Sequence, residues 1–270
     1  MSSILDKIVK QTSSDLKRRK RDVSVKDLES FEGFYKERYL LSENLKSESE
    51  VTIIAEVKKA SPSKGVIRPD FDPLKIAESY YKNGASAISV LTDEPFFQGS
   101  LTYLEKIAKE IPIPLLRKDF IIDPYQISEA KAFGADAILI IVSITKGDQL
   151  QELLSAAKEA SLEALVECYS PEDADRLDYD QFPILGVNNR DLHTFEVDLH
   201  KGIELLQAAP GHIVTVSESG ISKPEDLVKL YENKIDAALI GEYFMRQPNP
   251  GEALASMLES FNKKMNLELK

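Results

Sequence analysis

The chain has 270 residues, of which 43% are hydrophobic and 29% charged, a composition typical of an ordinary globular protein. Its formal net charge of −11 argues against a general nucleic-acid-binding role, because a phosphate backbone favours a basic surface. The one cysteine excludes an internal disulfide, and no stretch reaches the ~18 consecutive apolar residues that span a membrane. The N-terminus lacks the apolar core of a signal peptide, so we expect a soluble, cytoplasmic protein.

Residues 1–50 contain two segments with helical spacing of apolar residues, at 2–20 and 24–37. They hold too little apolar material to form a core of their own. We therefore expect an N-terminal helical extension that packs on the remainder of the chain, within a single domain of residues 1–270. The basic run Lys17–Arg21 is interpreted as an exposed helix face rather than a nucleic-acid patch.

From residue 51 onward, a short apolar run followed by a loop and an amphipathic stretch recurs eight times. The apolar runs, each expected to form a strand, span residues 51–57, 85–92, 114–120, 135–144, 163–169, 183–189, 212–219 and 237–243. Strands that alternate with helices favour parallel pairing through right-handed crossovers, and eight units in about 200 residues favour a closed (β/α)8 TIM barrel. An open doubly wound sheet is the alternative, although no glycine-rich fingerprint follows the first strand.

Helix starts between these runs carry capping signals. Four of them place a capping side chain before a proline, at Asp72-Pro73, Asp123-Pro124, Ser170-Pro171 and Asn249-Pro250. Two more are predicted from the spacing of a capping box, Thr145 with Asp148 and Ser222 with Glu225.

Polar side chains stand near the C-terminal ends of five predicted strands, where a TIM barrel carries its active site. In the first strand, Glu56 and the following Lys58 share the face of Ile54, because side chains alternate along a strand. The other strand-end residues are Lys118, Glu167, the run Asn188-Asn189-Arg190, and Glu218 with Ser219 and Gly220. One such residue is compatible with an ordinary surface position, but five strands that end this way favour a shared site.

Lysine and glutamate in one site indicate proton transfer, because burial lowers the pKa of lysine and raises the pKa of glutamate toward neutrality. Lys58 and Lys118 at close range would lower each other's pKa further, whereas Glu56 would oppose that shift. The sequence leaves the assignment of acid and base open.

The loops after the seventh and eighth predicted strands indicate a phosphate site, which TIM barrels often build there. Gly220 and Gly241 allow backbone N–H groups to approach a phosphate, and Ser219 adds a hydroxyl. The three histidines lack metal-ligand spacing, and no dinucleotide fingerprint is present. We expect acid–base chemistry on a phosphorylated substrate, without a metal or a coenzyme.

Several motifs resemble those of the indole-3-glycerol-phosphate synthase family. In chain order they are IIAEVKKASPSKG (53–65), LTDEPFFQGS (91–100), LLRKDFIIDPYQI (115–127), LVECYS (165–170), GVNNRDL (186–192) and SESGIS (217–222). The resemblance implies a carboxy-lyase of tryptophan biosynthesis. Such an enzyme converts 1-(2-carboxyphenylamino)-1-deoxyribulose 5-phosphate to an indole, with loss of carbon dioxide and water and without a metal or coenzyme.

The resemblance also implies roles for single residues. Lys118 would be the general acid of ring closure, and Glu167 and Lys58 would serve the later proton transfers, with Glu56 in support. Asn188 matches a position near the anthranilate carboxylate and the ribulose hydroxyls. The remaining matches are Ser61, Arg190, Glu218, Ser219, Gly220 and Gly241 around the anionic groups, and Phe97, Phe120 and Leu192 around the anthranilate ring. Glu242 is expected to offer only its backbone N–H and to turn its side chain outward.

Two other functions remain as alternatives. A phosphoribosyl-anthranilate isomerase needs an acid and a base but no decarboxylation, and such isomerases use a Cys/Asp or Asp/Asp pair rather than lysines and glutamates. An inactive binding or scaffold protein would be marked by loss of Lys118 or Glu167, and both are present. The expected partner is a small-molecule substrate alone, without nucleic acid or membrane, and a monomer is a possible assembly.

Overall fold

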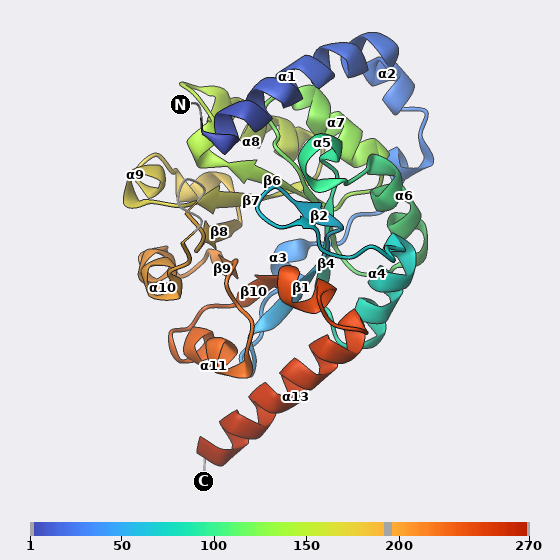
Figure 1. The fold of residues 1–270 in the computed structure, drawn as a ribbon. Helices are drawn as coiled ribbons and strands as arrows, with labels where there is room; N and C mark the ends of the chain where they lie inside the picture. The colour runs from blue at the N-terminus through green and yellow to red at the C-terminus, as the bar shows by residue number, and fades with distance from the viewer. Residues whose placement is uncertain (1–2, 192–195, 269–270) are drawn as a thin grey trace.

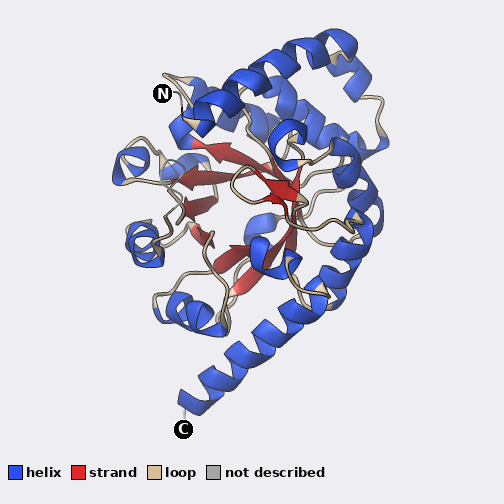
Figure 2. Ribbon diagram, in the orientation of Figure 1, coloured by secondary structure: helices blue, strands red, loops and turns tan. Residues whose placement is uncertain are grey.

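The computed structural model describes residues 3–191 and 196–268, and its centre is a closed barrel of eight parallel strands (Figures 1 and 2). The strands are β1 (Thr52–Val57), β4 (Ala87–Leu91), β5 (Leu115–Lys118), β6 (Ala137–Ile141), β7 (Glu163–Cys168), β8 (Ile184–Asn188), β9 (Val214–Glu218) and β10 (Ala237–Ile240). Each pairs with the next along the chain, and β10 closes on β1 with Ala237 beside Thr52. The predicted TIM barrel is confirmed, and every predicted apolar run contains one barrel strand.

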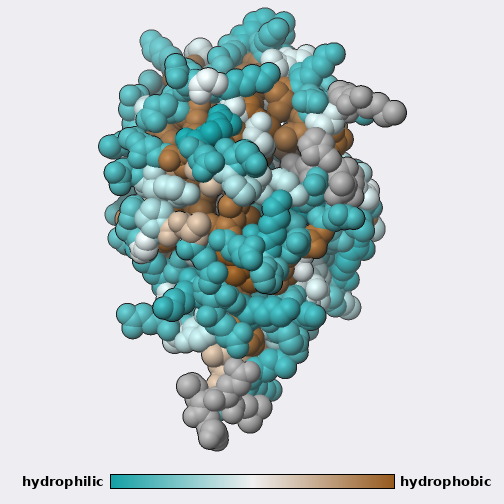
Figure 3. All heavy atoms as spheres, turned by 90° about the vertical axis from the view of Figure 1, so that its left-hand side faces the viewer, coloured by the Kyte–Doolittle hydropathy of each residue, from teal (hydrophilic) through white to brown (hydrophobic). Residues whose placement is uncertain are grey.

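Helices surround the barrel on its outside, as Figure 2 shows. The longer ones are α4 (Pro73–Lys82), α6 (Leu101–Glu110), α7 (Pro124–Ala132), α8 (Gln149–Glu159), α10 (Leu199–Gln207), α11 (Pro224–Glu232) and α13 (Pro250–Glu268). Short helices α5 (Glu94–Phe97), α9 (Pro171–Ala174) and α12 (Glu242–Met245) and a hairpin of β2 (Ala60–Ser61) and β3 (Gly65–Val66) lie in the connections. On the face shown in Figure 3, hydrophilic residues cover most of the surface and hydrophobic ones lie in the recesses between them.

The four predicted Xaa-Pro helix starts are confirmed, but the two predicted capping boxes are wrong. Asp148 itself occupies the cap position of α8, and its side chain makes no capping hydrogen bond. In α11 the proline at the first helical position moves the cap to Lys223. The carboxylate of Asp226, rather than that of Glu225, therefore accepts the backbone N–H groups of Ser222 and Lys223.

The alternation of side chains in each strand produces two separate apolar layers. Ile53, Ala55 and Val57 of β1 face the surrounding helices, in the layer between barrel and helices. Ile54 faces the barrel interior, with Leu116 and Leu165 from other strands. Glu56 is the next inward position of β1, so the same alternation that buries Ile54 turns a carboxylate toward the C-terminal mouth of the barrel.

The N-terminal extension contacts both ends of the barrel. Its first helix, α1 (Ile4–Asp22), lies next to α7 in Figure 1, and the Arg19–Glu129 ion pair of 2.9 Å joins the two helices. The predicted second helix is wrong, because residues 24–37 form α2 (Val25–Leu28) and a separate 3-10 turn, η1 (Glu32–Tyr35). Gly33 lies so close to the Ala132 carbonyl that a side chain at this position would collide with it, and this contact holds the turn against α7.

The extension then closes the N-terminal end of the barrel. Leu41, the first residue of α3 (Leu41–Asn44), and Leu45 just beyond it are fully buried in the interior apolar layer. Two polar contacts join this part of the extension to residues at the N-terminal ends of β6 and β7. The Lys36 ammonium lies 3.0 Å from an Asp136 carboxylate oxygen, and the Ser42 N–H donates to Glu163 at 2.8 Å.

We infer from these contacts that the extension and the barrel form one folding unit. Leu41→Ala should lower the free energy of unfolding by about 2–5 kcal/mol, because it leaves a cavity in a fully buried layer. Leu40→Ala is the matched control: its side chain is 45% exposed, so the loss should stay below about 1 kcal/mol. Urea unfolding measures both. A single transition in all three proteins supports the inference, whereas a separate early transition of the extension would contradict it.

Candidate active site

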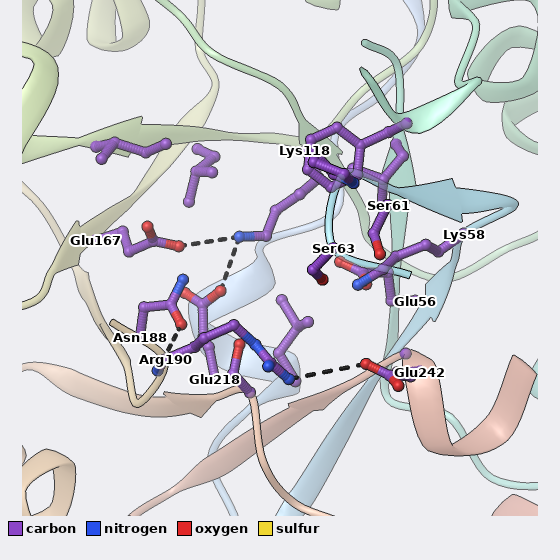
Figure 4. A pocket seen from close by; sticks show the side chains of 18 of the residues that line it. Glu56, Lys58, Ser61, Ser63, Lys118, Glu167, Asn188, Arg190, Glu218 and Glu242 are labelled. Carbon is purple, nitrogen blue, oxygen red and sulfur yellow. Dashed lines mark hydrogen bonds and ion pairs between the residues drawn. The ribbon is translucent and has the colours of Figure 1, made fainter. Parts of the chain in front are cut away.

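A pocket opens at the C-terminal ends of the barrel strands, opposite the end that Leu41 and Leu45 close (Figure 4). The predicted site residues that line it are Glu56, Lys58, Ser61, Phe97, Lys118, Phe120, Glu167, Asn188, Arg190, Glu218, Ser219, Gly220, Gly241 and Glu242. Leu192, the remaining predicted residue, lies outside the described residues. The barrel thus brings together side chains that are up to about two hundred positions apart in sequence, and their chemical roles stay predictions.

The floor of the pocket is one ammonium group held between two carboxylates. The Lys118 Nζ lies 3.0 Å from Glu167 Oε2 and 2.8 Å from Glu218 Oε2 (Figure 4). The three side chains come from β5, β7 and β9, and in a TIM barrel the inward residues of alternate strands form one layer. Glu218, predicted among the substrate- and phosphate-binding residues, has its carboxyl group on Lys118 at 2.8 Å, and its predicted role stays a prediction.

The electrostatics of this group correct the prediction that burial brings the lysine pKa toward neutrality. Burial alone would lower the pKa of Lys118, but the carboxylates of Glu167 and Glu218, with Glu56 behind them, raise it above the ordinary lysine value. Lys118 is therefore firmly protonated in the absence of substrate. The prediction took account of desolvation, of the second lysine and of an opposing Glu56, but not of the two nearest carboxylates, those of Glu167 and Glu218.

Glu218 behaves as the prediction for a buried glutamate expects. Burial raises the pKa of Glu218 to about 8, because the stabilising effect of Lys118 is smaller and the neighbouring Glu167 raises the pKa further. Its second oxygen, Oε1, is buried and accepts no hydrogen bond from any residue in 3–191 or 196–268. A side chain at Gly186 on β8 would collide with this oxygen, so a glycine there leaves room for the Glu218 carboxyl group.

The second lysine has a carboxylate of its own. The Lys58 Nζ lies 2.9 Å from Glu56 Oε1, and the two residues reach the pocket from the end of β1. Gly241 packs against this carboxylate so closely that a side chain at position 241 would collide with Glu56 Oε1. Gly241 therefore makes room for Glu56, in addition to the phosphate role predicted from the sequence.

The apolar part of the pocket has an aromatic wall and a helical roof. The rings of Phe97, on α5, and Phe120, just after β5, lie with their centroids 6.0 Å apart. Ile4, Leu5 and Ile8 of α1 complete the lining from above. The spacing of apolar residues predicts a helix here, but it does not show which part of the barrel the helix covers. These three residues were therefore not predicted as part of the site.

Charged and polar groups occupy the rim near β8, β9 and β10. The Arg190 guanidinium lies 3.7 Å from the Glu242 carboxylate, which also accepts a hydrogen bond of 3.0 Å from Arg246. Glu242 thus lies between two arginines and lines the pocket, rather than turning outward as expected. Asn188 Oδ1 accepts the Arg190 backbone N–H at 3.1 Å. The Ser61 hydroxyl, which also lines the pocket, is buried and has no hydrogen-bond partner among the residues that the structure describes.

Asn189, which the sequence grouped with the strand-end residues without giving it a role, supports the turn after β9. Its buried amide donates to the Ser217 hydroxyl and to the Ser219 carbonyl, both at 2.9 Å. Ser219 and Gly220 have positive φ values of 69° and 79°, which turn the chain sharply at the pocket edge. The sequence shows two adjacent asparagines at the end of a strand, where alternate side chains take opposite sides. Asn188 faces the pocket, and Asn189 supports the turn.

Among residues 3–191 and 196–268, no group of three or more His, Cys, Asp or Glu side chains has a geometry that would hold a metal ion. The same residues contain no helix that is both long and apolar enough to span a membrane.

Comparison with known proteins places this geometry in a family. Residues 5–257 match the family model described as indole-3-glycerol phosphate synthase. The chain is 50% identical over 266 residues to the indole-3-glycerol phosphate synthase of Salinibacter ruber, with 97% of each chain covered. It is 47% identical over 259 residues to that of Campylobacter jejuni, with 94% of this chain and 100% of the relative covered.

Solved structures support the fold alone. A tryptophan synthase alpha-subunit from Pyrococcus furiosus superposes with a TM-score of 0.60 at 14% identity, covering 80% of this chain and 99% of that chain. This likeness agrees with the TIM barrel described above.

The raised pKa of Glu218 predicts a specific pH dependence of stability. A carboxyl group whose folded pKa lies above its unfolded value contributes stability that is fully present below the unfolded pKa and is lost as the pH rises through the folded pKa. Between about pH 4.5 and pH 8 the parent should therefore lose stability relative to Glu218→Gln as the pH rises. Urea unfolding of both proteins from pH 5 to pH 9 measures the difference, and parallel curves would contradict the raised pKa.

Proposed function

The chain belongs to the indole-3-glycerol phosphate synthase family, and we propose that the residues at its barrel mouth perform this family's ring closure in the roles given below. The activity is that of a carboxy-lyase of tryptophan biosynthesis, acting on a phosphosugar-anthranilate substrate. The observation that carries the assignment of roles is the Lys118 ammonium between Glu167 and Glu218, at the floor of a pocket with an aromatic wall.

Ring closure needs an acid at the ketose oxygen. As the ring carbon that bears the carboxylate attacks the carbonyl carbon, a C–C bond forms and the carbonyl oxygen gains an electron pair. Lys118 donates a proton to this oxygen and yields a hydroxyl group. Because neighbouring carboxylates raise its pKa, Lys118 reaches this step fully protonated at neutral pH.

Two further steps complete the indole. The C–C bond to the carboxylate breaks, carbon dioxide leaves, and the electron pair returns to the ring and restores its aromaticity. The new hydroxyl group then leaves as water after it accepts a proton, and a base accepts the proton that the five-membered ring loses. Glu167 and Lys58 serve these later proton transfers, and Glu56 fixes the Lys58 ammonium at 2.9 Å.

The other lining residues bind the substrate. Phe97 and Phe120 hold the anthranilate ring, and the apolar roof of α1 strips water from its carboxylate, which favours loss of carbon dioxide. Asn188 and Arg190 face the carboxylate and the sugar hydroxyls. Ser61, Ser219, Gly220 and Gly241 surround the phosphate, with Glu242 as the counter-ion of Arg190.

The isomerase alternative has little support in this pocket. Cys168 would be its candidate acid or base, but this residue faces the layer between barrel and helices, where burial raises the pKa of its thiol. We also propose that the protein is cytoplasmic, that it acts as a monomer and that it does not bind nucleic acid.

Turnover offers a direct test, because the chain has no tryptophan and an indole product stands out in fluorescence. We expect the anilino-deoxyribulose phosphate substrate to give indole emission without added metal or nucleotide. Lys118→Ala should lower kcat by ~10²–10⁴-fold with its fold intact, because general acids typically contribute that much. Lys109→Ala, on the exposed surface of α6, is the control and should match the parent. Lys118→Ala turnover equal to that of the parent would contradict the proposed role.

A further inference from the structure

A second set of charges lies behind Lys118, on the outer face of β5. Arg117 is fully buried there, and Asp119 and Glu129 are 6% and 3% exposed. Thr92, Gln126 and Arg19 complete the set, which we call the Arg117 cluster. A buried guanidinium is costly unless it is paired and fully hydrogen-bonded, so its position needs a reason beyond stability.

All three nitrogens of the Arg117 guanidinium are engaged. Nη2 lies 2.8 Å from Asp119 Oδ2 and 3.3 Å from Glu129 Oε2, and Nη1 donates to the Gln126 carbonyl at 2.6 Å. Nε donates to the Thr92 hydroxyl at 3.1 Å, and that hydroxyl donates to Asp119 at 2.6 Å. Burial alone would raise the pKa of Asp119, but Arg117 and Thr92 outweigh it and hold the pKa below its ordinary value.

The cluster clamps the backbone on both sides of Lys118. Arg117 and Asp119 are its two chain neighbours, and their side chains pair with each other in the cluster at 2.8 Å. Phe120 is fixed in the same way: its N–H donates to Asp119 at 2.8 Å, and its carbonyl accepts from the Gln126 amide at 3.0 Å. The Lys118 side chain can therefore reach its two carboxylates only from one backbone position.

The cluster also reaches the other walls of the pocket. Thr92 precedes Asp93, whose carboxylate accepts the Phe97 N–H at 3.1 Å and so caps the short helix of the aromatic wall. On the outer side, Arg19 of α1 lies 2.9 Å from Glu129 Oε2, and α1 carries the apolar roof. One buried network thus joins the strand of Lys118, the aromatic wall and the roof.

We propose that Arg117 is a positioning residue for ring closure, which acts through Lys118 by fixing the end of β5 from behind. This inference rests on the role proposed above for Lys118. A network with two anions, two cations and a hydroxyl has few alternative arrangements, because any shift leaves a buried charge unpaired. A misplacement of about 1 Å at the reacting groups is enough to cost ~10²-fold in rate.

A double-mutant cycle tests the inference on purified full-length protein with the indole fluorescence assay. Arg117→Lys keeps the charge but loses the forked hydrogen bonds, so kcat should fall by ~10–10²-fold while KM changes less than kcat. In the Lys118→Ala background, the same substitution should lower kcat by less than ~3-fold, because the group that it positions is gone. Equal losses in both backgrounds, or no loss in the parent background, would overturn the inference.

Further variants separate positioning from general damage. Lys36→Met breaks the Lys36–Asp136 pair at the closed end of the barrel and should lower the melting temperature while kcat stays within ~2-fold of the parent. If Arg117→Lys does not fold, Thr92→Val removes the bridging hydroxyl with little change of shape and enters the same cycle. Full activity of Lys118→Ala would refute the role proposed for Lys118, and a parent protein that yields no indole emission would refute the proposed function. Equal losses in both backgrounds refute only the role of Arg117.

Discussion

The pairing of one lysine with two carboxylates at the barrel floor is the interaction on which the rest of the site depends. Lys118 cannot lose its proton easily while both Glu167 and Glu218 are near, and Glu218 in turn holds its proton to unusually high pH. Lys118 and Glu218 therefore titrate as a coupled pair rather than as independent residues. In the proposed mechanism, an incoming ketose oxygen meets a charged acid that is largely desolvated and held by two carboxyl groups, as electrostatic preorganisation requires.

Strand β5 serves the site with both of its faces. Its inner face presents Lys118 to the pocket, and its outer face carries the Arg117 cluster, which ties the strand to α7 and α1. The N-terminal extension contacts both ends of the same barrel, with Leu41 and Leu45 at the closed N-terminal end and Ile4, Leu5 and Ile8 in the roof of the pocket. A segment outside the eight strand–helix units thus covers the pocket with apolar side chains and contributes, through Arg19, to the network behind β5.

Much of this could be predicted from the sequence because it follows local rules. Alternation placed Glu56 on the inner face of β1, and the eight apolar runs gave the barrel and its active end. The partner of Lys118 could not be predicted, since it depends on which strands share a layer across the barrel. The direction of the Lys118 pKa shift could not be predicted for the same reason, because the shift combines the effects of charges on three other strands. The break between α2 and η1 and the roof formed by α1 likewise depend on contacts distant in sequence.

The most direct test of the account is a crystal structure with an unreactive substrate analogue, in which the ketose carbonyl is reduced to a hydroxyl group. The account predicts that this hydroxyl oxygen lies within hydrogen-bond distance, about 3 Å, of the Lys118 Nζ. It also predicts the anthranilate ring against Phe97 and Phe120, and the phosphate at Gly220 and Gly241. An analogue bound with its hydroxyl remote from Lys118, and the Lys118 contacts to Glu167 and Glu218 undisturbed, would contradict the central role of this lysine.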